Sequence, residues 1–135
     1  MAYWLMKSEP ESYTWADLVA EGTTEWTGVR NPAAALHLKA VAVGDRAFFY
    51  HSGKEKAVVG VMEVVRSARQ DGDQPRWVSV AVAPVAAMPT PVTLAAIKAE
   101  PRLAGLEMLR QSRLSVSPVD AEAWGVVLAL GGLTA

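Results

Sequence analysis

The stretch WLMKSEPES, residues 4–12, begins almost at the first residue and changes character halfway. Its first three residues are apolar, the next three are polar, and Pro10 follows. An aromatic and apolar run stopped by proline is typical of a short β-strand. Because a chain end stays disordered unless something ties it down, the pattern predicts a buried strand over residues 3–7. This strand leads into a polar rim, which is either plain surface or one wall of a site.

Capping residues mark the expected helices. Ser12 or Thr14 can accept the first backbone hydrogen bond of one helix, Asn31 with Pro32 opens a second, and Asp120 opens the last. Glycines close several of these segments, as expected at helix ends. The expected helices cover residues 15–21, 32–40, 93–100, 105–111 and 121–130.

The remaining apolar runs are rich in valine and aromatic residues, which prefer strands. Strands are expected over residues 46–51, 57–66 and 77–85, and an extended segment over residues 113–119. Strands grouped in the middle of the chain, without regular alternation with helices, indicate an α+β domain. Five or six strands in so short a chain favour a small, partly open barrel with short flanking helices, forming one domain over residues 1–135.

Composition and charge narrow the classes of partner. The chain has 135 residues, 51% of them hydrophobic, and a formal net charge of -1 from 13 basic and 14 acidic residues. Near-neutral charge argues against coating long stretches of duplex, where affinity comes from neutralising many phosphates. No apolar run approaches the length of a membrane span, and no signal peptide is visible. We therefore expect a cytoplasmic protein without a membrane partner, with a monomer favoured.

Metal and cofactor chemistry has little support. The sequence contains no cysteine, and its two histidines, His37 and His51, are not at a metal-ligand spacing. The pair His51–Ser52 suggests a hydrolase, but adjacent strand residues point to opposite faces. Neither a nucleophile elbow nor a glycine-rich phosphate loop is present. We expect no cofactor, no metal and no catalytic residue.

Several strand-like segments end in polar residues, and these ends can meet at one mouth. The residues concerned are Lys7, Ser8, Glu9, Trp26, Arg30, Asn31, Tyr50, His51, Ser52, Arg113 and Ser115. The simpler interpretation takes each piece separately, with serines in turns, Asn31 as a helix cap and Trp26 as an ordinary core aromatic. Trp26, however, lies in a short extended piece close to Arg30 and Asn31. An aromatic ring that stacks on a base, beside polar groups that contact its edge, is a minimal nucleobase pocket.

The same segments resemble a known family. YWLMKSEP, WTGVRNP, VGDRAFFYHS, KAVVGVMEVV, QPRWVSVAV and RQSRLSVSPV follow one another in the order and spacing of the EVE domain family. The resemblance runs from Tyr3 to Trp124. It implies a PUA-like pseudo-barrel related to PUA, ASCH and YTH domains. It also implies a reader of modified bases, chiefly modified cytosine in DNA, with RNA binding also proposed for the family.

The resemblance assigns roles to the matching positions. Trp26 would stack on an extruded base, with Tyr50 as a second candidate, and Glu9 would accept a hydrogen bond from an exocyclic amine. The implied base pocket comprises Lys7, Ser8, Glu9, Trp26, Asn31, Tyr50, His51, Ser52, Leu114 and Ser115, and the implied phosphate contacts are Arg30, Lys54 and Arg113. Two other functions stay open: an accessory protein that recognises modified RNA, and an enzyme acting on a modified base with Glu9 or His51 as acid or base. A small-ligand or protein-interaction domain using the same pocket is the weakest alternative.

Overall fold

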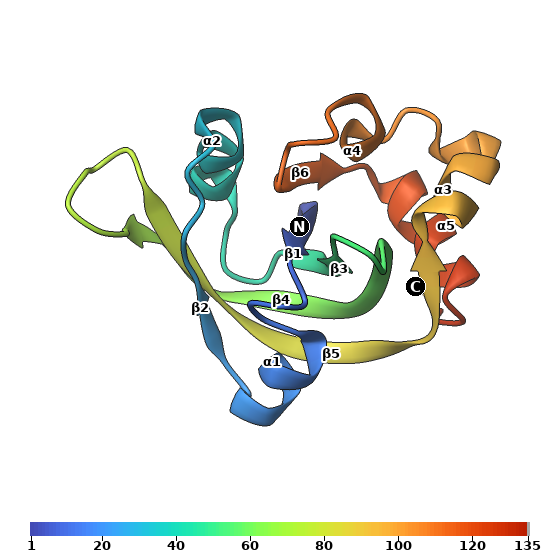
Figure 1. Cartoon of the computed structure of the whole chain (residues 1–135), viewed down its shortest axis with the longest axis horizontal. Coiled ribbons are helices and arrows are strands. Elements are labelled where there is room, and N and C mark those ends of the chain that lie inside the picture. The colour runs from blue at the N-terminus through green and yellow to red at the C-terminus, as the bar shows by residue number, and fades with distance from the viewer. Residues whose placement is uncertain (135) are drawn as a thin grey trace.

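The computed structural model describes residues 1–134, which form one sheet of six strands flanked by five short α-helices (Figure 1). The strands are β1 (Tyr3–Ser8), β2 (Thr24–Trp26), β3 (Arg46–His51), β4 (Ala57–Gln70), β5 (Val78–Thr93) and β6 (Val116–Val119). The helices are α1 (Trp15–Glu21), α2 (Pro32–Ala40), α3 (Leu94–Ala99), α4 (Glu107–Arg110) and α5 (Ala121–Leu130), with the 3₁₀ turn η1 (Pro101–Leu103) between α3 and α4. The predicted α+β class and the number of strands are confirmed.

The sheet is open. Its strand order is β2-β5-β4-β3-β1-β6, so β2 and β6 are its two edges in the described chain. β1 and β3 run parallel, and all other neighbours are antiparallel. Figure 1 shows β4 and β5 as long, bent strands that cross the whole molecule. The predicted partly open barrel is thus a curved sheet whose edge strands do not pair with each other.

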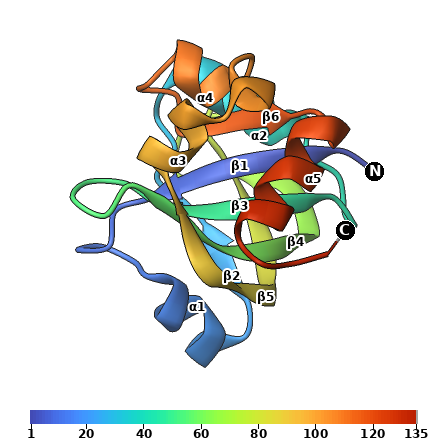
Figure 2. The same ribbon diagram turned by 90° about the vertical axis from the view of Figure 1, so that its right-hand side faces the viewer.

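β1 is tied down on both sides. It pairs with β3 from Tyr3 to Ser8 and with β6 from Tyr3 to Met6, and Figure 2 shows it between these two strands. The indole nitrogen of Trp4 also donates a hydrogen bond to Asp45 Oδ2 (3.0 Å). The prediction of a buried first strand is confirmed, and Lys7 and Ser8 close its carboxyl end.

Each face of the sheet has its own apolar core, because side chains alternate along a strand. Trp4, Met6 and Phe49 belong to the core covered by α1 and α2. Leu5 and Phe48 belong to the core covered by α3, α4 and α5. Figure 1 shows α1 below the long strands β4 and β5, α2 above them, and α3, α4 and α5 together at the right. Near the carboxyl end of β3, Phe49 belongs to the first core and Tyr50 to the second.

Several element boundaries differ from the sequence prediction; β4, for example, ends at Gln70 rather than at residue 66. β5 continues to Thr93, beyond Pro84 and through the prolines at 89 and 91. The register between β4 and β5 shifts between Val58 and Gly60, and residues 88–91 of β5 have no partner in β4, so the missing N–H groups of Pro89 and Pro91 cost no ladder hydrogen bond. At the other end, β6 begins at Val116 rather than at residue 113, because the N–H of Leu114 closes a turn onto the carbonyl of Gln111 (3.1 Å).

Candidate functional site

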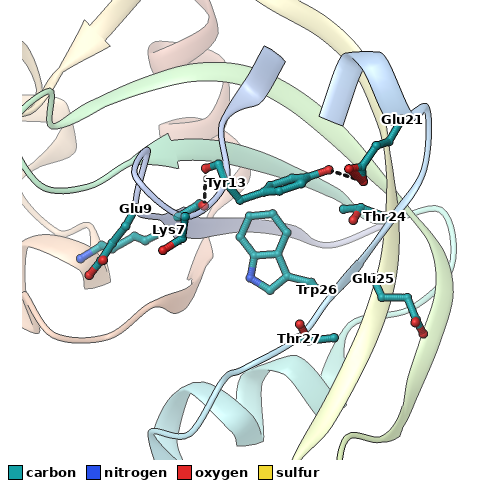
Figure 3. Close-up of a pocket in the computed structure, with 10 residues that line it drawn as sticks. Lys7, Glu9, Tyr13, Glu21, Thr24, Glu25, Trp26 and Thr27 are labelled. Atoms are coloured by element: carbon teal, nitrogen blue, oxygen red, sulfur yellow. Dashed lines mark hydrogen bonds between the residues drawn. The ribbon is translucent and has the colours of Figure 1, made fainter. Parts of the chain in front are cut away.

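A cavity of about 490 Å³ opens between the end of β1, the turn that follows it, and β2 (Figure 3). We call this cavity the Trp26 pocket. Its volume lies within the range of about 300–1,000 Å³ that is usual for small-molecule sites. Its walls are Lys7, Ser8, Glu9, Ser12, Tyr13, Glu21, Thr24, Glu25, Trp26 and Thr27.

The turn after β1 is held by its own hydrogen bonds. The Ser8 hydroxyl donates to the carbonyl of Tyr13 (2.7 Å), and the N–H groups of Ser12 and Tyr13 both donate to the carbonyl of Glu9 (2.9 Å each). The N–H of Ser52 donates to the Ser8 carbonyl (2.9 Å), which ties the turn to the end of β3. The sequence KSEP therefore forms a fixed wall whose Glu9 side chain remains exposed.

Two aromatic rings line the pocket. Trp26 is 7% exposed and packs edge-on against Phe49, with ring centroids 5.4 Å apart. Tyr13 is only partly buried, and Figure 3 shows the Trp26 indole between Tyr13 and Thr27. Trp26 thus belongs both to the core and to the pocket wall, and its stacking on a base stays a prediction.

The acidic side chains of the pocket differ in how far they are engaged. The Tyr13 hydroxyl donates to Glu21 Oε1 (2.9 Å), and Glu25 is paired with Arg66 and Arg69. Burial raises the pKa of Tyr13, and the Glu21 carboxylate adds to this, so the hydroxyl stays protonated as a donor. Glu9 makes no side-chain hydrogen bond or ion pair to residues 1–134. It is therefore the free acceptor at this pocket.

The structure brings four of the implied base-pocket residues together here: Lys7, Ser8, Glu9 and Trp26. Other candidates line separate hollows. Tyr50 and Ser52 share a second cavity with Lys7. Asn31, Arg113 and Leu114 line a shallow hollow near α2, and Lys54 lines another beside α3. The polar strand ends predicted to meet at one mouth are thus divided between several hollows, and the contacts of the outlying residues with a base stay predictions.

Several candidates have structural contacts of their own. Asn31 Oδ1 caps α2 by accepting from the Ala34 N–H (3.0 Å). His51 is 8% exposed, and its Nε2 accepts from the Trp15 N–H (3.1 Å) while its Nδ1 faces Glu55 Oε1. A nitrogen that accepts an N–H carries no proton, so His51 is the neutral tautomer with its proton on Nδ1.

Leu114 is 2% exposed and packs in the core with Val116. Ser115 is partly buried, and its carbonyl accepts from the Lys7 N–H (2.9 Å). The RLSV segment therefore contributes the Leu114 side chain to the core and holds the end of β1 through the backbone hydrogen bond from Lys7 to Ser115.

Arg30 lies beside the tip of the β4–β5 hairpin rather than in the pocket. Its guanidinium pairs with Asp71 Oδ2 (3.0 Å), and the same oxygen accepts from the Gly28 N–H (2.9 Å). The Gly28 hydrogen bond, together with Arg30, holds the pKa of Asp71 below its ordinary value. Arg30 also lies over the ring of Trp77, 5.6 Å from its centroid. This cluster fixes the hairpin tip to the segment between β2 and α2.

Sequence reasoning missed Tyr13, Glu21 and Thr24 as pocket residues. Tyr13 stands between KSEP and the helix cap Thr14, where no periodicity assigns it a face. Glu21 and Thr24 flank the turn between α1 and β2, which only the folded chain brings opposite β1. The one available signal was an aromatic residue close to the polar rim.

The described part of the chain has neither a cluster of metal-ligating side chains nor a membrane-spanning helix. No group of three or more His, Asp or Glu side chains among residues 1–134 is placed to hold a metal ion. No helix of these residues is long and apolar enough to cross a membrane.

Comparisons with known proteins agree with the resemblance seen in the sequence. The EVE domain family matches residues 2–130. Human thymocyte nuclear protein 1 is 33% identical over 165 aligned residues, covering 96% of this chain and 73% of the human protein. A crystal structure of human THYN1 in complex with DNA containing 5-methylcytosine has a TM-score of 0.92 at 32% identity, covering 100% of both chains.

Two other solved structures define the fold further. A protein of Agrobacterium tumefaciens has a TM-score of 0.95 at 41% identity, covering 98% of this chain and 94% of its own. An ASCH protein of Zymomonas mobilis has a TM-score of 0.60 at 13% identity, covering 99% of each chain, and this likeness concerns the fold alone. The predicted PUA-like fold is confirmed.

Proposed function

The chain belongs to the EVE domain family, and on this premise we propose that it is a non-catalytic nucleic-acid-binding protein that accepts an extruded base in the Trp26 pocket. Modified cytosine in DNA is the favoured base. The observation that carries the proposal is the pocket itself: two aromatic walls, Trp26 and Tyr13, beside the free carboxylate of Glu9. The complex of human THYN1 with 5-methylcytosine DNA supports the choice of base.

The chemistry of the walls fits cytosine better than thymine. Cytosine presents an exocyclic amine, a donor, where thymine presents a carbonyl oxygen. The carboxylate of Glu9 accepts hydrogen bonds and cannot donate them when ionised. The Glu9 carboxylate therefore attracts the exocyclic amine of cytosine and repels the carbonyl oxygen of thymine.

A methyl group on cytosine adds apolar surface to be buried against the rings. Burying one such group contributes about 0.8 kcal/mol, roughly a fourfold gain in affinity. Extrusion of the base costs about a few kcal/mol, and less from a mismatch or a single strand. The gain in affinity from the methyl group is thus modest, and it adds to the discrimination between bases by Glu9.

The outer contacts complete the proposal. Arg113 and Lys54 are exposed and lie outside the Trp26 pocket, where they are placed to meet backbone phosphates. Arg30, already paired with Asp71, is placed to contribute at the hairpin side. Phosphate contacts of this kind position the strand without specifying its sequence. We retain a cytoplasmic location as part of the proposal.

The test compares oligonucleotides that differ in one base: 5-methylcytosine, cytosine or thymine, at a stated salt concentration. We expect 5-methylcytosine to bind most tightly and thymine least. Glu9→Ala should abolish the gap between 5-methylcytosine and thymine, a loss of about 1–3 kcal/mol of discrimination. Glu11→Ala is the matched control, since Glu11 is exposed and does not line the pocket.

Further arms of this test address the alternatives. Equal binding of thymine and 5-methylcytosine by the unmodified protein would contradict the role of Glu9. Matched ribo-oligonucleotides test for RNA, because only RNA offers the 2′-hydroxyl. Conversion of the bound base to a new product, followed by mass spectrometry, would show an enzyme instead.

A further inference from the structure

A second cavity, of about 300 Å³, lies on the other side of Lys7, between the end of β3 and the helices α3 and α4. We call it the lysine pocket. Lys7, Lys56 and Lys98 line it together with Tyr50 and with the apolar side chains of Leu94 and Met108. Lys54 joins Lys56 and Lys98 in the adjoining hollow. Four of the five lysines of the chain therefore gather in this region.

None of these lysines forms an ion pair with residues 1–134, whereas four of the eight arginines do. Arg30, Arg66, Arg69 and Arg102 each pair with a carboxylate. Among residues 1–134, no carboxylate oxygen lies within 4.0 Å of a lysine ammonium group. The nearby acid, Glu55, faces His51 instead. A chain with a net charge of -1 thus concentrates uncompensated positive charge at one pocket.

The floor of the pocket adds a neutral donor. Tyr50 is 3% exposed, and its hydroxyl makes no side-chain hydrogen bond within the described chain. Burial raises the pKa of Tyr50, so its hydroxyl keeps its proton and can donate. The Lys7 ammonium lies 5.8 Å from the centroid of the Tyr50 ring and donates to the carbonyl of Ser112 (2.9 Å).

Lys7 connects this pocket to the Trp26 pocket, because it lines both. The paired ends of β1 and β3, with Lys7 opposite Tyr50 and Ser8 opposite His51, form the partition between them. Figure 3 shows the Lys7 side chain extending away from the Trp26 indole. A nucleic-acid strand whose base enters the Trp26 pocket near Lys7 can place its next backbone group at the lysine pocket.

We infer that the lysine pocket binds a backbone phosphate of a nucleotide next to the base held in the Trp26 pocket, with Lys56, Lys98 and Tyr50 as the contacting groups. This inference rests on the proposed function. Ammonium groups bind phosphate as point charges, and such contacts add affinity and salt dependence without reading the base. The apolar side chains of Leu94 and Met108 offer a surface for the sugar of the same nucleotide.

The first experiment measures affinity against salt concentration for a single-stranded oligonucleotide with one 5-methylcytosine. The double variant Lys56→Gln/Lys98→Gln should bind methylated and unmethylated strands more weakly by the same factor. Its logarithmic salt slope should be shallower by about 1 to 2. Lys39→Gln, which changes the fifth lysine on the exposed side of α2, is the matched control and should leave affinity and slope unchanged.

The second experiment removes the charge from the nucleic acid. A methylphosphonate replaces the phosphate on the 5′ or on the 3′ side of the modified nucleotide. At one of the two positions, the neutral group should weaken binding by the wild-type protein. It should leave binding by the double variant almost unchanged, because both changes remove the same contact. The inference is wrong if the lysine substitutions lower the affinity for both methylphosphonate strands by the same factor. It is also wrong if the substitutions leave the salt slope unchanged.

The two proposals can fail separately. Preference for 5-methylcytosine over thymine reports on the Trp26 pocket, whereas the salt slope and the methylphosphonate coupling report on the lysine pocket. If the wild type binds no oligonucleotide, both assignments are wrong. Shifts of the Ser52 and Gly53 amide resonances on titration with inorganic phosphate would then identify a site for free anions only.

Discussion

Asp45, directly before β3, shows how many hydrogen bonds a single buried carboxylate can accept. Its side chain accepts hydrogen bonds from the N–H of Ala2 (3.0 Å), the indole of Trp4 (3.0 Å) and the N–H of Ala42 (2.9 Å). Burial by itself raises the pKa of Asp45, but these hydrogen bonds outweigh it and hold the pKa below its ordinary value. Asp45 thereby joins the beginning of β1 to the loop before β3.

We predict that Asp45→Asn lowers the free energy of unfolding at neutral pH by about 1–3 kcal/mol, because an amide leaves buried donors unsatisfied. In the wild type this stabilisation is complete above the ordinary aspartate pKa of about 3.9. It is lost as the pH falls through the lower folded-state pKa, so the two proteins should converge in acid. Urea denaturation at several pH values measures this, with the exposed Asp73→Asn as control. A constant difference down to pH 2 would contradict it.

Trp26 lies in the core and in the wall of the Trp26 pocket. We predict that Trp26→Ala lowers the free energy of unfolding by about 3–5 kcal/mol, since it removes a buried ring that packs against Phe49. Chemical denaturation provides the measurement. Loss of binding by this variant therefore cannot identify the base site alone, and the polar Glu9 is the better probe. An unchanged stability would mean that Trp26 is not part of the core.

At the scale of elements, local signals predicted the positions of helices better than the lengths of strands. Thr14, Asn31 and Asp120 each cap the helix that the sequence assigned to them. Caps act within one turn of the chain, so three or four residues suffice to recognise them. The end of β5 depends instead on where its register with β4 shifts, and the division of the polar strand ends depends on which face each one takes. Neither the end of β5 nor the division of the polar strand ends can be predicted from residues that are close together in the sequence.

The docking of α1 on the sheet rests on a glycine. A Cβ at Gly60 in β4 would lie 2.6 Å from ring atoms of Trp15, the first residue of α1. We predict that Gly60→Ala destabilises the protein by about 1–3 kcal/mol through overpacking. Gly125→Ala in α5, where a Cβ meets nothing within 4 Å, should instead stabilise by up to about 1 kcal/mol. Denaturant midpoints of both variants test this, and equal effects would mean that α1 can shift away from β4 at little cost.

At the scale of the molecule, the sheet separates a base-sized pocket from a cationic one and places Lys7 between them. The Trp26 pocket opens on the side of α1, and the lysine pocket opens on the side of α3 and α4. The carboxyl end of β1 contributes to both pockets, and the carboxyl end of β3, its parallel neighbour, contributes to the lysine pocket. The resemblance to a family predicts a base site at these strand ends, because several of its motifs end there. It did not predict the lysine pocket, because Lys56 and Lys98 are 42 positions apart and Lys98 lies outside every quoted motif.

The overall charge sets the last prediction, which concerns unmodified duplex DNA. With a net charge of -1 and four of its eight arginines paired with acids, the protein offers few unpaired cations, among them the lysines around the lysine pocket. We expect weak binding with about three or four phosphate contacts, and therefore a logarithmic salt slope near -3 rather than -10. Fluorescence anisotropy between about 50 and 200 mM salt gives this slope. A steep slope would reveal an extended basic surface elsewhere on the molecule, and the phosphate contacts would then have to be sought beyond the carboxyl ends of β1 and β3.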